Sequence, residues 1–445
     1  MNDASAKNSV ITYGCRLNSI ESQVISDHLS SLNKSDDIIV VHSCAVTKNA
    51  EKESYDKVRE LIKKNNLLDA SVRKKIFVTG CSVQLDPDKY LDLGVDKVIG
   101  NADKLNIDSY RDGSEKKIWR DIMNVSSIGE LPQTTRIEGK TRGLIQIQNG
   151  CDHDCTFCVI YKARGKNRSV NLPEIIEQIR VLVRNGYAEI VLTGVDITDY
   201  GKDLDPKLSL GKLIKKIFAL VPGVLRLRLS SIDVDEIDEE LFEILSNESR
   251  VMPYFHLSMQ SGSNMILKRM KRRHLRDDIY NFCEKILEKR TESVFGADII
   301  AGFPTETDEF FQETVDLISE IPNFVHLHIF PFSAHSGTPA SRMPQVNGKI
   351  IKERARILRD IGQKNLINFA KSKIGSLEDV LFESKNFGRT NQFIKVVLED
   401  SDISNLNVLS GKILKMKISD ILIDSIGVKD GSVLEKFAFL KSRIV

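Results

Sequence analysis

The sequence predicts an α/β protein of three successive units: an N-terminal doubly wound parallel-sheet domain, a central open partial barrel of six strand–helix units, and a small C-terminal β-barrel. Two runs in which apolar strand patterns alternate with helical patterns predict the first two units, because such alternation forms parallel sheets covered by helices. Short strand patterns separated by turns predict the third unit. We expect the units to span residues 1–120, 137–373 and 375–445, and 445 residues are enough for three domains.

The N-terminal unit is predicted from three strand patterns and two helical ones. Strands are expected at Ser9–Gly14, Asp37–Ser43 and Lys75–Gly80, with helices at Ser19–Leu32 and Lys48–Lys64 between them. The second strand, DDIIVVHS, is continuously apolar at its centre, as strands buried on both faces are. A parallel sheet with helices on both faces is the expected result.

A cysteine directly follows each of these strands: Cys15, Cys44 and Cys81. In parallel sheets ligands bind at the carboxyl ends of the strands, and these ends lie on one rim, so the three thiols should converge. A buried cysteine often serves only as a small apolar side chain, and that alternative holds for any one of them. Three at the same topological position favour a shared metal site. Three thiolates without a fourth suggest a cluster with one open iron.

The central unit is predicted from six strand patterns and the helical patterns between them. The strands are expected at Leu144–Gln148, Glu189–Gly194, Leu225–Ser230, Tyr254–Gln260, Val294–Ala301 and Val325–Phe330. Six units are too few for a closed eight-fold barrel, so we expect an open one. Its active site should lie at the carboxyl ends of the strands, as in closed barrels.

Three further cysteines follow the first of these strands in a C-x3-C-x2-C arrangement: Cys151, Cys155 and Cys158. A zinc loop usually combines two cysteine pairs into four ligands, which this loop does not offer. Ordinary 4Fe–4S clusters take four thiolates, so a loop with three leaves one iron open for a substrate. This spacing, with Phe157 before the last cysteine, is typical of radical S-adenosylmethionine (SAM) enzymes, whose cluster binds SAM through its amino and carboxylate groups.

Small and polar residues follow the other central strands on the same predicted rim. Each one alone is explained equally well by ordinary turn chemistry. Their shared position favours hydrogen bonds to the ribose, carboxylate and amino group of SAM. The predicted SAM-binding residues are Thr193, Gly194, Ser230, Ser258, Gln260, Gly262 and Asp298. No side chain is identified as a general base.

The C-terminal segment and the basic residues bear on nucleic-acid binding. Small β-barrels commonly bind RNA through one face, but this segment is not net basic, so a structural cap remains an equal alternative. Basic residues gather instead after the cysteine loop and after the fourth strand, near the rim. We expect the following to contact a phosphate backbone, against the alternative of a solvated charged face: Lys162, Arg164, Arg168, Arg272 and Arg273.

Composition limits the compartment and the partners. The formal net charge of +2 is nearly neutral, so any RNA binding must come from local patches. Seven cysteines, an odd number without a secretion-signal pattern, indicate a reducing compartment, and we expect the cytoplasm. No apolar stretch approaches membrane-spanning length, so a membrane partner is not expected.

Nearly the whole chain resembles the methylthiotransferases, radical SAM enzymes that insert sulfur into a C–H bond and methylate it. The resemblance lies in TYGCRLNSIES, HSCAVT, GCSVQ, GCDHDCTFC, LTGVD, RLSSID, HLSMQSGS, ADIIAGFPTET and a C-terminal segment similar to a TRAM domain. HLSMQSGS and HLHIFPFSAHSGTPASRMPQV are most similar to the branch that acts on N6-threonylcarbamoyladenosine, beside the anticodon of tRNA.

The resemblance implies SAM and two 4Fe–4S clusters, one on each cysteine trio. It implies that the loop cluster reduces SAM to methionine and a 5′-deoxyadenosyl radical, which activates C2 of adenine. Sulfur would come from or through the other cluster, and a second SAM would supply the methyl group. The implied partners are the anticodon arm of tRNA, a low-potential electron donor and a sulfur donor.

Three alternatives remain at this point. A sister methylthiotransferase acting on isopentenyladenosine in tRNA, or on a ribosomal protein, would share every cysteine. A different radical SAM enzyme with an auxiliary cluster would not need the TRAM-like segment. A non-enzymatic iron–sulfur RNA-binding protein would not cleave SAM.

Overall fold

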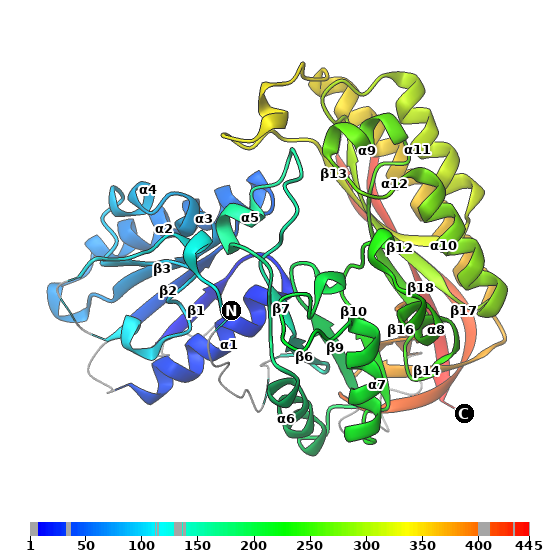
Figure 1. Ribbon diagram of the computed structural model, residues 1–445, viewed down its shortest axis with the longest axis horizontal. Coiled ribbons are helices and arrows are strands. Elements are labelled where there is room, and N and C mark those ends of the chain that lie inside the picture. Colours follow the sequence, from blue (N-terminus) through cyan, green and yellow to red (C-terminus); the bar gives the residue numbers. More distant parts are fainter. Residues whose placement is uncertain are drawn as a thin grey trace.

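The computed structural model describes residues 8–32, 37–111, 113, 115–128, 136, 139–398, 410–429 and 432–444. The N-terminal sheet and its helices lie on one side of the molecule and the central strands with their helices on the other, with the segment carrying α5 and β7 between them (Figure 1). No helix in the described ranges is long and apolar enough to cross a membrane.

The N-terminal domain is a five-stranded parallel sheet in the order β1-β2-β3-β4-β5. Its strands are β1 Ser9–Thr12, β2 Ile38–Ser43, β3 Lys75–Gly80, β4 Lys97–Ile99 and β5 Lys117–Ile118, and its helices are α1 Arg16–Ser31, α2 Lys48–Asn66, α3 Cys81–Leu85 and α4 Asp88–Leu91. Neighbouring residues of β2 serve opposite faces: Val40 packs with Ile25 of α1, and Val41 packs with Val58 of α2. The predicted sheet with helices on both faces is therefore confirmed. The three-residue strand β4 was not predicted.

The central unit is the predicted open barrel, built from two three-stranded parallel sheets in the orders β10-β9-β6 and β11-β12-β13. Its strands are β6 Gly143–Gln146, β9 Glu189–Thr193, β10 Arg226–Leu229, β11 Tyr254–Gln260, β12 Val294–Ala301 and β13 Phe324–Pro331. Isolated parallel bridges, Leu227 to Val251 and Ile232 to Leu257, join the two sheets.

Helices alternate with these strands along the chain. They are α5 Ile160–Arg164, α6 Leu172–Arg184, α7 Leu210–Leu220, α8 Glu239–Asn247, α9 Asn264–Met270, α10 Arg276–Lys289, α11 Asp308–Glu320 and α12 Gly348–Ser372. A short antiparallel pair, β7 Gln148–Asn149 and β8 Arg168–Ser169, closes the cysteine loop. Single 3-10 turns lie at Ala70–Val72, Ile107–Tyr110, Ile122–Asn124, Ile197–Asp199, Val234–Glu236 and Pro339–Arg342.

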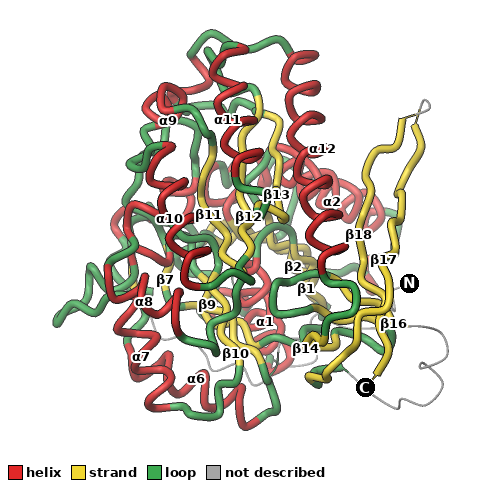
Figure 2. The backbone as a smooth tube through the Cα atoms, turned by 90° about the vertical axis from the view of Figure 1, so that its right-hand side faces the viewer, coloured by secondary structure: helices red, strands yellow, loops and turns green. Residues whose placement is uncertain are grey.

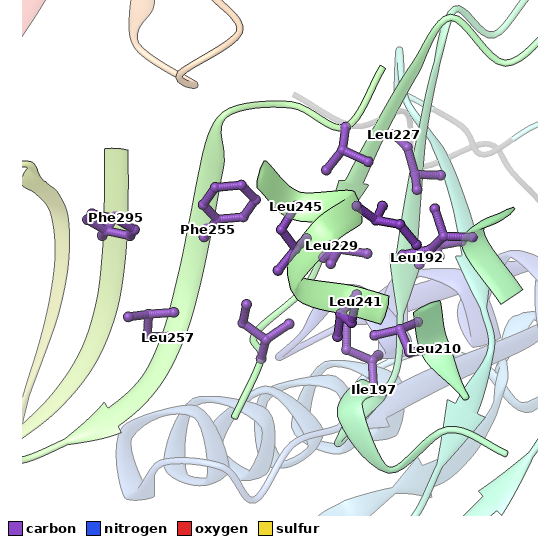
Figure 3. Close-up of a cluster of buried hydrophobic side chains, with 14 of the residues drawn as sticks. Leu192, Ile197, Leu210, Leu227, Leu229, Leu241, Leu245, Phe255, Leu257 and Phe295 are labelled. Atoms are coloured by element: carbon purple, nitrogen blue, oxygen red, sulfur yellow. The ribbon is translucent and has the colours of Figure 1, made fainter. Parts of the chain in front are cut away.

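The main core lies between the central strands and the helices outside them (Figure 3). Leu192 of β9 and Leu229 of β10 meet Leu210 of α7 and Leu241 of α8 there, all buried. Complete burial of one such leucine stabilises a fold by roughly 1.5–3 kcal/mol. Because these helices cover the outer faces of the strands, the opposite faces are left for another partner.

That partner is α1 of the N-terminal domain. Leu17 and Ile20 of α1 form a buried cluster with Leu144 of β6 and Val191 of β9. Ile145, next in the chain to Leu144, points instead into the main core. The N-terminal domain is thus docked on the inner face of the first sheet, with Cys15 at the start of the docked helix.

The C-terminal domain is a closed barrel in the order β14-β15-β16-β18-β17, which confirms the predicted small β-barrel. Its strands are β14 Leu377–Phe382, β15 Phe387–Arg389, β16 Lys395–Leu398, β17 Ile413–Lys429 and β18 Ser432–Ile444. Figure 2 shows that β17 and β18 extend as a long ribbon beyond the other strands of the barrel. The turn before β16 reaches the central strands: the guanidinium of Arg228 donates to the carbonyls of Thr390 and Asn391, and the ring of Phe393 stacks on Tyr254.

We expect Leu17→Ala to lower the free energy of unfolding by about 2–5 kcal/mol, because it leaves a cavity where α1 meets the central sheet. Leu67→Ala is the matched control, since Leu67 is 81% exposed against 2% for Leu17. Thermal and denaturant unfolding of both variants measure the effect. An equal, small loss in both would contradict the docking of α1 as a stabilising interface.

Candidate active site at two cysteine trios

The first trio lies at the carboxyl end of the N-terminal sheet. Cys15 precedes α1, Cys44 follows β2, and Cys81 opens α3 directly after β3. Burial, followed by the nearby thiols of Cys81 and Cys15, raises the pKa of Cys44 to about 12. Thr12 pairs with His42 and Ser43 with Gly80, so the three cysteines follow neighbouring strands on one rim of the sheet.

Two glycines bring this trio together. Gly14 has φ +98°, and a Cβ there would lie 2.6 Å from the Cys44 sulfur. Gly80 has φ +105°, and a Cβ there would lie 2.2 Å from the carbonyl oxygen of Ser43. Only glycine accepts this backbone conformation without strain and also allows such an approach.

The second trio lies on the loop between β7 and α5. Burial is the first cause of the raised pKa of Cys158, about 11, and of the raised pKa of Cys151. The amides of His153 and Ile160 donate to the sulfurs of Cys151 and Cys158 at 3.4 and 3.3 Å.

Both trios fit iron–sulfur clusters in their chemistry. All seven cysteines of the chain are free of disulfides. Buried thiols with a raised pKa stay protonated at neutral pH until a cation compensates for the charge of the thiolate, and metal binding releases their protons. A loop amide that donates to sulfur also favours the thiolate form.

A cavity of about 660 Å³ lies between the segment that follows Cys44 and the loop around Cys158. One wall is the segment after Cys44, a second is the loop around Cys158, and a third is the carboxyl ends of β11, β12 and β13. Its lining is mainly apolar, and it includes Val46, Phe157, Val159, Ile160, Ile300, Ile329, Phe330 and Phe332. Two of the predicted SAM-binding residues, Gln260 and Asp298, line it.

The other predicted SAM-binding residues differ in whether their polar groups already have partners within the protein. Ser230 has a buried hydroxyl without a hydrogen-bond partner among the described residues, and a Cβ on Gly194 would meet the Gln148 amide oxygen at 2.7 Å. The carbonyl of Ser258 accepts from Arg272, and the hydroxyl of Thr193 is buried on its own strand.

Gly262, also predicted as a SAM contact, packs against α11. Its amide donates to the hydroxyl of Thr314 at 2.9 Å, and a Cβ there would lie 2.7 Å from the Thr314 Cα. This glycine allows α11 to pack closely on the end of β11. The sequence pattern correctly placed Gly262 after β11. The partner of its amide depends on α11, which covers this end of the strand.

A hydrogen-bonded relay reaches the cavity through Asp298. Its carboxylate accepts from His256 Nε2 at 2.9 Å and from His328 Nδ1 at 3.1 Å, and the Tyr254 hydroxyl lies 2.9 Å from His256 Nδ1. Burial opposes ionisation, but the two histidines hold the pKa of Asp298 well below its usual range. Sequence reasoning missed the relay, because its members come from three strands and only their period of two gave a signal.

A second group of carboxylates lies beside the cysteine loop. His153 Nε2 is 3.4 Å from Asp196, 3.4 Å from Glu236 and 3.8 Å from Asp199, and Asp196 is itself 3.7 Å from the Cys151 sulfur. Burial, followed by a hydrogen bond with Glu236, raises the pKa of Asp199 to about 6. The four residues come from three loops, with Asp196 and Asp199 on the same one, so local sequence gave no signal for the whole cluster.

A buried polar network joins the two cysteine-bearing halves. Arg164 of α5 donates to both carboxylate oxygens of Glu21 in α1, at 2.9 and 3.1 Å, and to Asn18 at 2.6 Å. Lys104 Nζ lies 2.6 Å from the same carboxylate. His42 is buried 3.6 Å from Glu21 within this network.

Three of the five predicted RNA contacts bind other residues of the protein. Arg164 is held by Glu21, Arg168 donates to the Arg164 carbonyl, and Arg272 donates to Asp233 and to Ser258. Arg164 and Arg168 are buried and Arg272 is partly buried, because their segments turn inward from the rim. Arg273 is half-exposed and paired with Glu236, and Lys162 is exposed.

Comparison with known proteins agrees with this geometry. The model of the radical SAM superfamily matches residues 145–318, and the model of uncharacterized protein family UPF0004 matches residues 7–100. The chain is 47% identical to the threonylcarbamoyladenosine tRNA methylthiotransferase MtaB of Rickettsia prowazekii, over 88% of this chain and 91% of that one. The chain belongs to the methylthiotransferase family of radical SAM enzymes.

Two further matches place it within the family and the fold. The chain is 34% identical to MtaB of Aquifex aeolicus, over 87% of this chain and 95% of that one. The radical SAM methyltransferase TsrM of Kitasatospora setae superposes with a TM-score of 0.54 at 13% identity, over 84% of this chain and 78% of that one, which shows a shared fold. As a methylthiotransferase, the protein uses SAM and two 4Fe–4S clusters.

We expect Gly80→Ala to remove the cluster on the first trio, lowering iron from about eight to about four atoms per chain. Gly94→Ala is the control: Gly94 also has a positive φ, +89°, but open space at its Cβ. Both variants carry about 1–2 kcal/mol of left-handed strain, and only Gly80→Ala also meets Ser43. Iron and sulfide analysis after anaerobic reconstitution measures the cluster content of both variants. Equal iron in both variants would refute the role given to the close approach.

We expect Arg164→Gln to lower the free energy of unfolding by about 3–5 kcal/mol, because Glu21 would lose its buried partner. Adding Glu21→Gln should restore part of this loss. The salt dependence of RNA binding should not change in either variant. If stability is unchanged and the salt dependence of RNA binding becomes flatter, Arg164 is an RNA contact after all.

Proposed function

We propose that this protein is a tRNA methylthiotransferase that converts N6-threonylcarbamoyladenosine at the position beside the anticodon into its 2-methylthio derivative. The observation that carries the proposal is a cavity lined on one side by Cys158 and its loop and on another by the segment that follows Cys44. One trio would hold the cluster that binds SAM, and the other the cluster associated with sulfur. The 47% identity to MtaB of Rickettsia prowazekii supports the choice of substrate.

The residues of the chain have separate roles in this proposal. The clusters and SAM supply radical chemistry when bound, and the protein positions the reactants and excludes water. Cys151, Cys155 and Cys158 hold one cluster, and Cys15, Cys44 and Cys81 hold the other. The apolar walls around Phe157 and Phe330 suit the flat faces of nucleobases.

Residues on the strand ends would orient SAM. Gln260 and Asp298 lie on the cavity wall, and Thr193, Gly194, Ser230 and Ser258 lie at the same ends of neighbouring strands. Asp298 is held ionised by His256 and His328, so it offers a fixed acceptor. We assign residues 1–120 to cluster and sulfur handling, 137–373 to SAM and 375–445 to tRNA.

Further partners follow from the chemistry. One-electron reduction of SAM needs a low-potential electron donor, and net sulfur insertion needs a sulfur donor. Free cysteines and a tRNA substrate favour the cytoplasm. Lys162 and Arg273, which are partly or fully exposed near the cysteine loop, are the remaining candidates among the predicted contacts to the anticodon arm.

A second candidate is methylthiolation of isopentenyladenosine in tRNA. The chain is 33% identical to the tRNA-2-methylthio-N(6)-dimethylallyladenosine synthase of Rickettsia canadensis, over 85% of this chain and 88% of that one. The higher identity to the threonylcarbamoyladenosine enzymes favours the first candidate.

Mass analysis of tRNA nucleosides from cells with and without the gene tests the substrate. Loss of the gene should remove 2-methylthio-N6-threonylcarbamoyladenosine and leave its unthiolated precursor. If the 2-methylthio derivative of isopentenyladenosine disappears instead, the second candidate is correct.

Variants of the two trios should have different effects. Cys155→Ala should abolish formation of 5′-deoxyadenosine from SAM and leave about four irons on the first trio. The triple variant Cys15→Ala, Cys44→Ala, Cys81→Ala should still cleave SAM but form no methylthio product, because the sulfur-handling cluster is absent. Both readouts come from one anaerobic assay with chromatography. Normal product from the triple variant would refute the two-cluster division.

A further inference from the structure

A second cavity, of about 400 Å³, lies where the three domains meet. Its walls come from Gly14–Ser19 at the start of α1, from residues 139–144 before and in β6, and from the C-terminal barrel through Glu383, Phe387 and Phe393. Cys15 of the first trio lines it and is exposed there. The cavity exists only when all three domains are assembled.

Positive charge dominates this cavity. Arg16, Lys140, Arg142 and Arg228 line it, against the single carboxylate of Glu383. Arg16 and Lys140 are exposed, and neither forms an ion pair or hydrogen bond with a residue in the described ranges. The larger cavity beside Cys158 is mainly apolar by contrast, so the two cavities suit different parts of a ligand.

Arg142 has a free donor in the wall of this cavity. Its Nε donates to Glu189 at 2.5 Å and its Nη1 to Glu383 at 2.8 Å, while Nη2 is buried without a hydrogen-bond partner in the described structure. A buried charged donor without a partner costs about 1–3 kcal/mol or more, so such a group indicates a missing acceptor. Carboxylate and phosphate oxygens are the acceptors that a guanidinium binds best.

The aromatic side chains in the wall of this cavity also favour a nucleotide ligand. The ring of Phe393 lies 4.9 Å from the guanidinium of Arg142, 5.1 Å from that of Arg228 and 4.3 Å from that of Arg389. Phe393 also has φ +68°, a conformation that costs a bulky residue roughly 1–3 kcal/mol and is often kept at ligand sites. Aromatic rings beside arginine side chains are common surroundings of a nucleotide.

We propose that this cavity is an anion subsite for the RNA substrate, in which Arg142 and Arg16 bind an anionic oxygen group beside Cys15. The proposal rests on the proposed function, which supplies two sources of that group: the threonine carboxylate of the modified base, or a phosphate of a neighbouring nucleotide. Arg142 is a specificity-determining residue in the first case and a backbone contact in the second.

The variants for the test are Arg142→Gln and Arg16→Gln in the full, cluster-loaded protein. Arg142→Gln leaves no acid unpaired, because Glu189 keeps Arg228 at 2.7 Å and Glu383 keeps Arg389 at 2.9 Å. Arg59→Gln is the matched control, since Arg59 is an exposed arginine of α2 outside both cavities. Melting temperature and SAM cleavage without RNA verify that each variant is folded and loaded.

Binding is measured with three anticodon stem-loop RNAs: one with threonylcarbamoyladenosine, one with its neutral methyl ester, and one with unmodified adenosine. If the carboxylate is bound, both variants weaken binding of the first RNA about 10-fold and leave the other two unchanged. The ester then binds the unsubstituted protein as weakly as the first RNA binds the variants. If a phosphate is bound, all three RNAs weaken together and the salt slope falls by about one unit per lost contact.

The proposal is overturned if folded Arg142→Gln and Arg16→Gln bind all three RNAs as tightly as Arg59→Gln does. Failure of the proposed function is a different result. The protein would then form no methylthio product from threonylcarbamoyladenosine RNA, while the phosphate arm of the binding test would still report on the cavity.

Discussion

The buried contact between Arg164 and Glu21 is the constraint on which the arrangement of the two cysteine trios depends. Arg164 ends the short helix after the cysteine loop, and Glu21 lies on the helix that begins after Cys15. Two charge-assisted hydrogen bonds, with Asn18 and Lys104 beside them, fix the angle between these helices. Buried ion pairs often add little net stability, because desolvation offsets attraction, but a misplaced partner is strongly destabilising. The contact therefore specifies one docking geometry.

That docking geometry produces the catalytic cavity. The apolar contact of Leu17 and Ile20 with the inner face of β6 and β9 buries apolar surface, and the polar network fixes the orientation of α1. With α1 in place, the segment after Cys44 faces the loop of Cys158 across a single space. Segments next to both trios thus line the same cavity.

The C-terminal barrel has a part in this arrangement beyond its own fold. Its turn before β16 is held by Arg228 and stacks Phe393 on Tyr254, the first member of the relay that ends at Asp298. The barrel, which we propose binds tRNA, thus reaches the wall of the larger cavity through the side chains of Tyr254 and His256.

The sequence by itself determined the cysteine loop, the alternation of strands and helices, and the meeting of Cys15, Cys44 and Cys81. These follow from local spacing and from a general property of parallel sheets, that their strand ends share a rim. Only the tertiary structure decided where the side chains on that rim point. Arg164, Arg168 and Arg272 lie in basic stretches, yet packing turns them inward onto partners more than a dozen residues away or onto backbone carbonyls. The relay of His256, Asp298 and His328 likewise needs three strands in register. Such long-range pairings leave no local pattern, because each partner is fixed by packing and not by its neighbours in the chain.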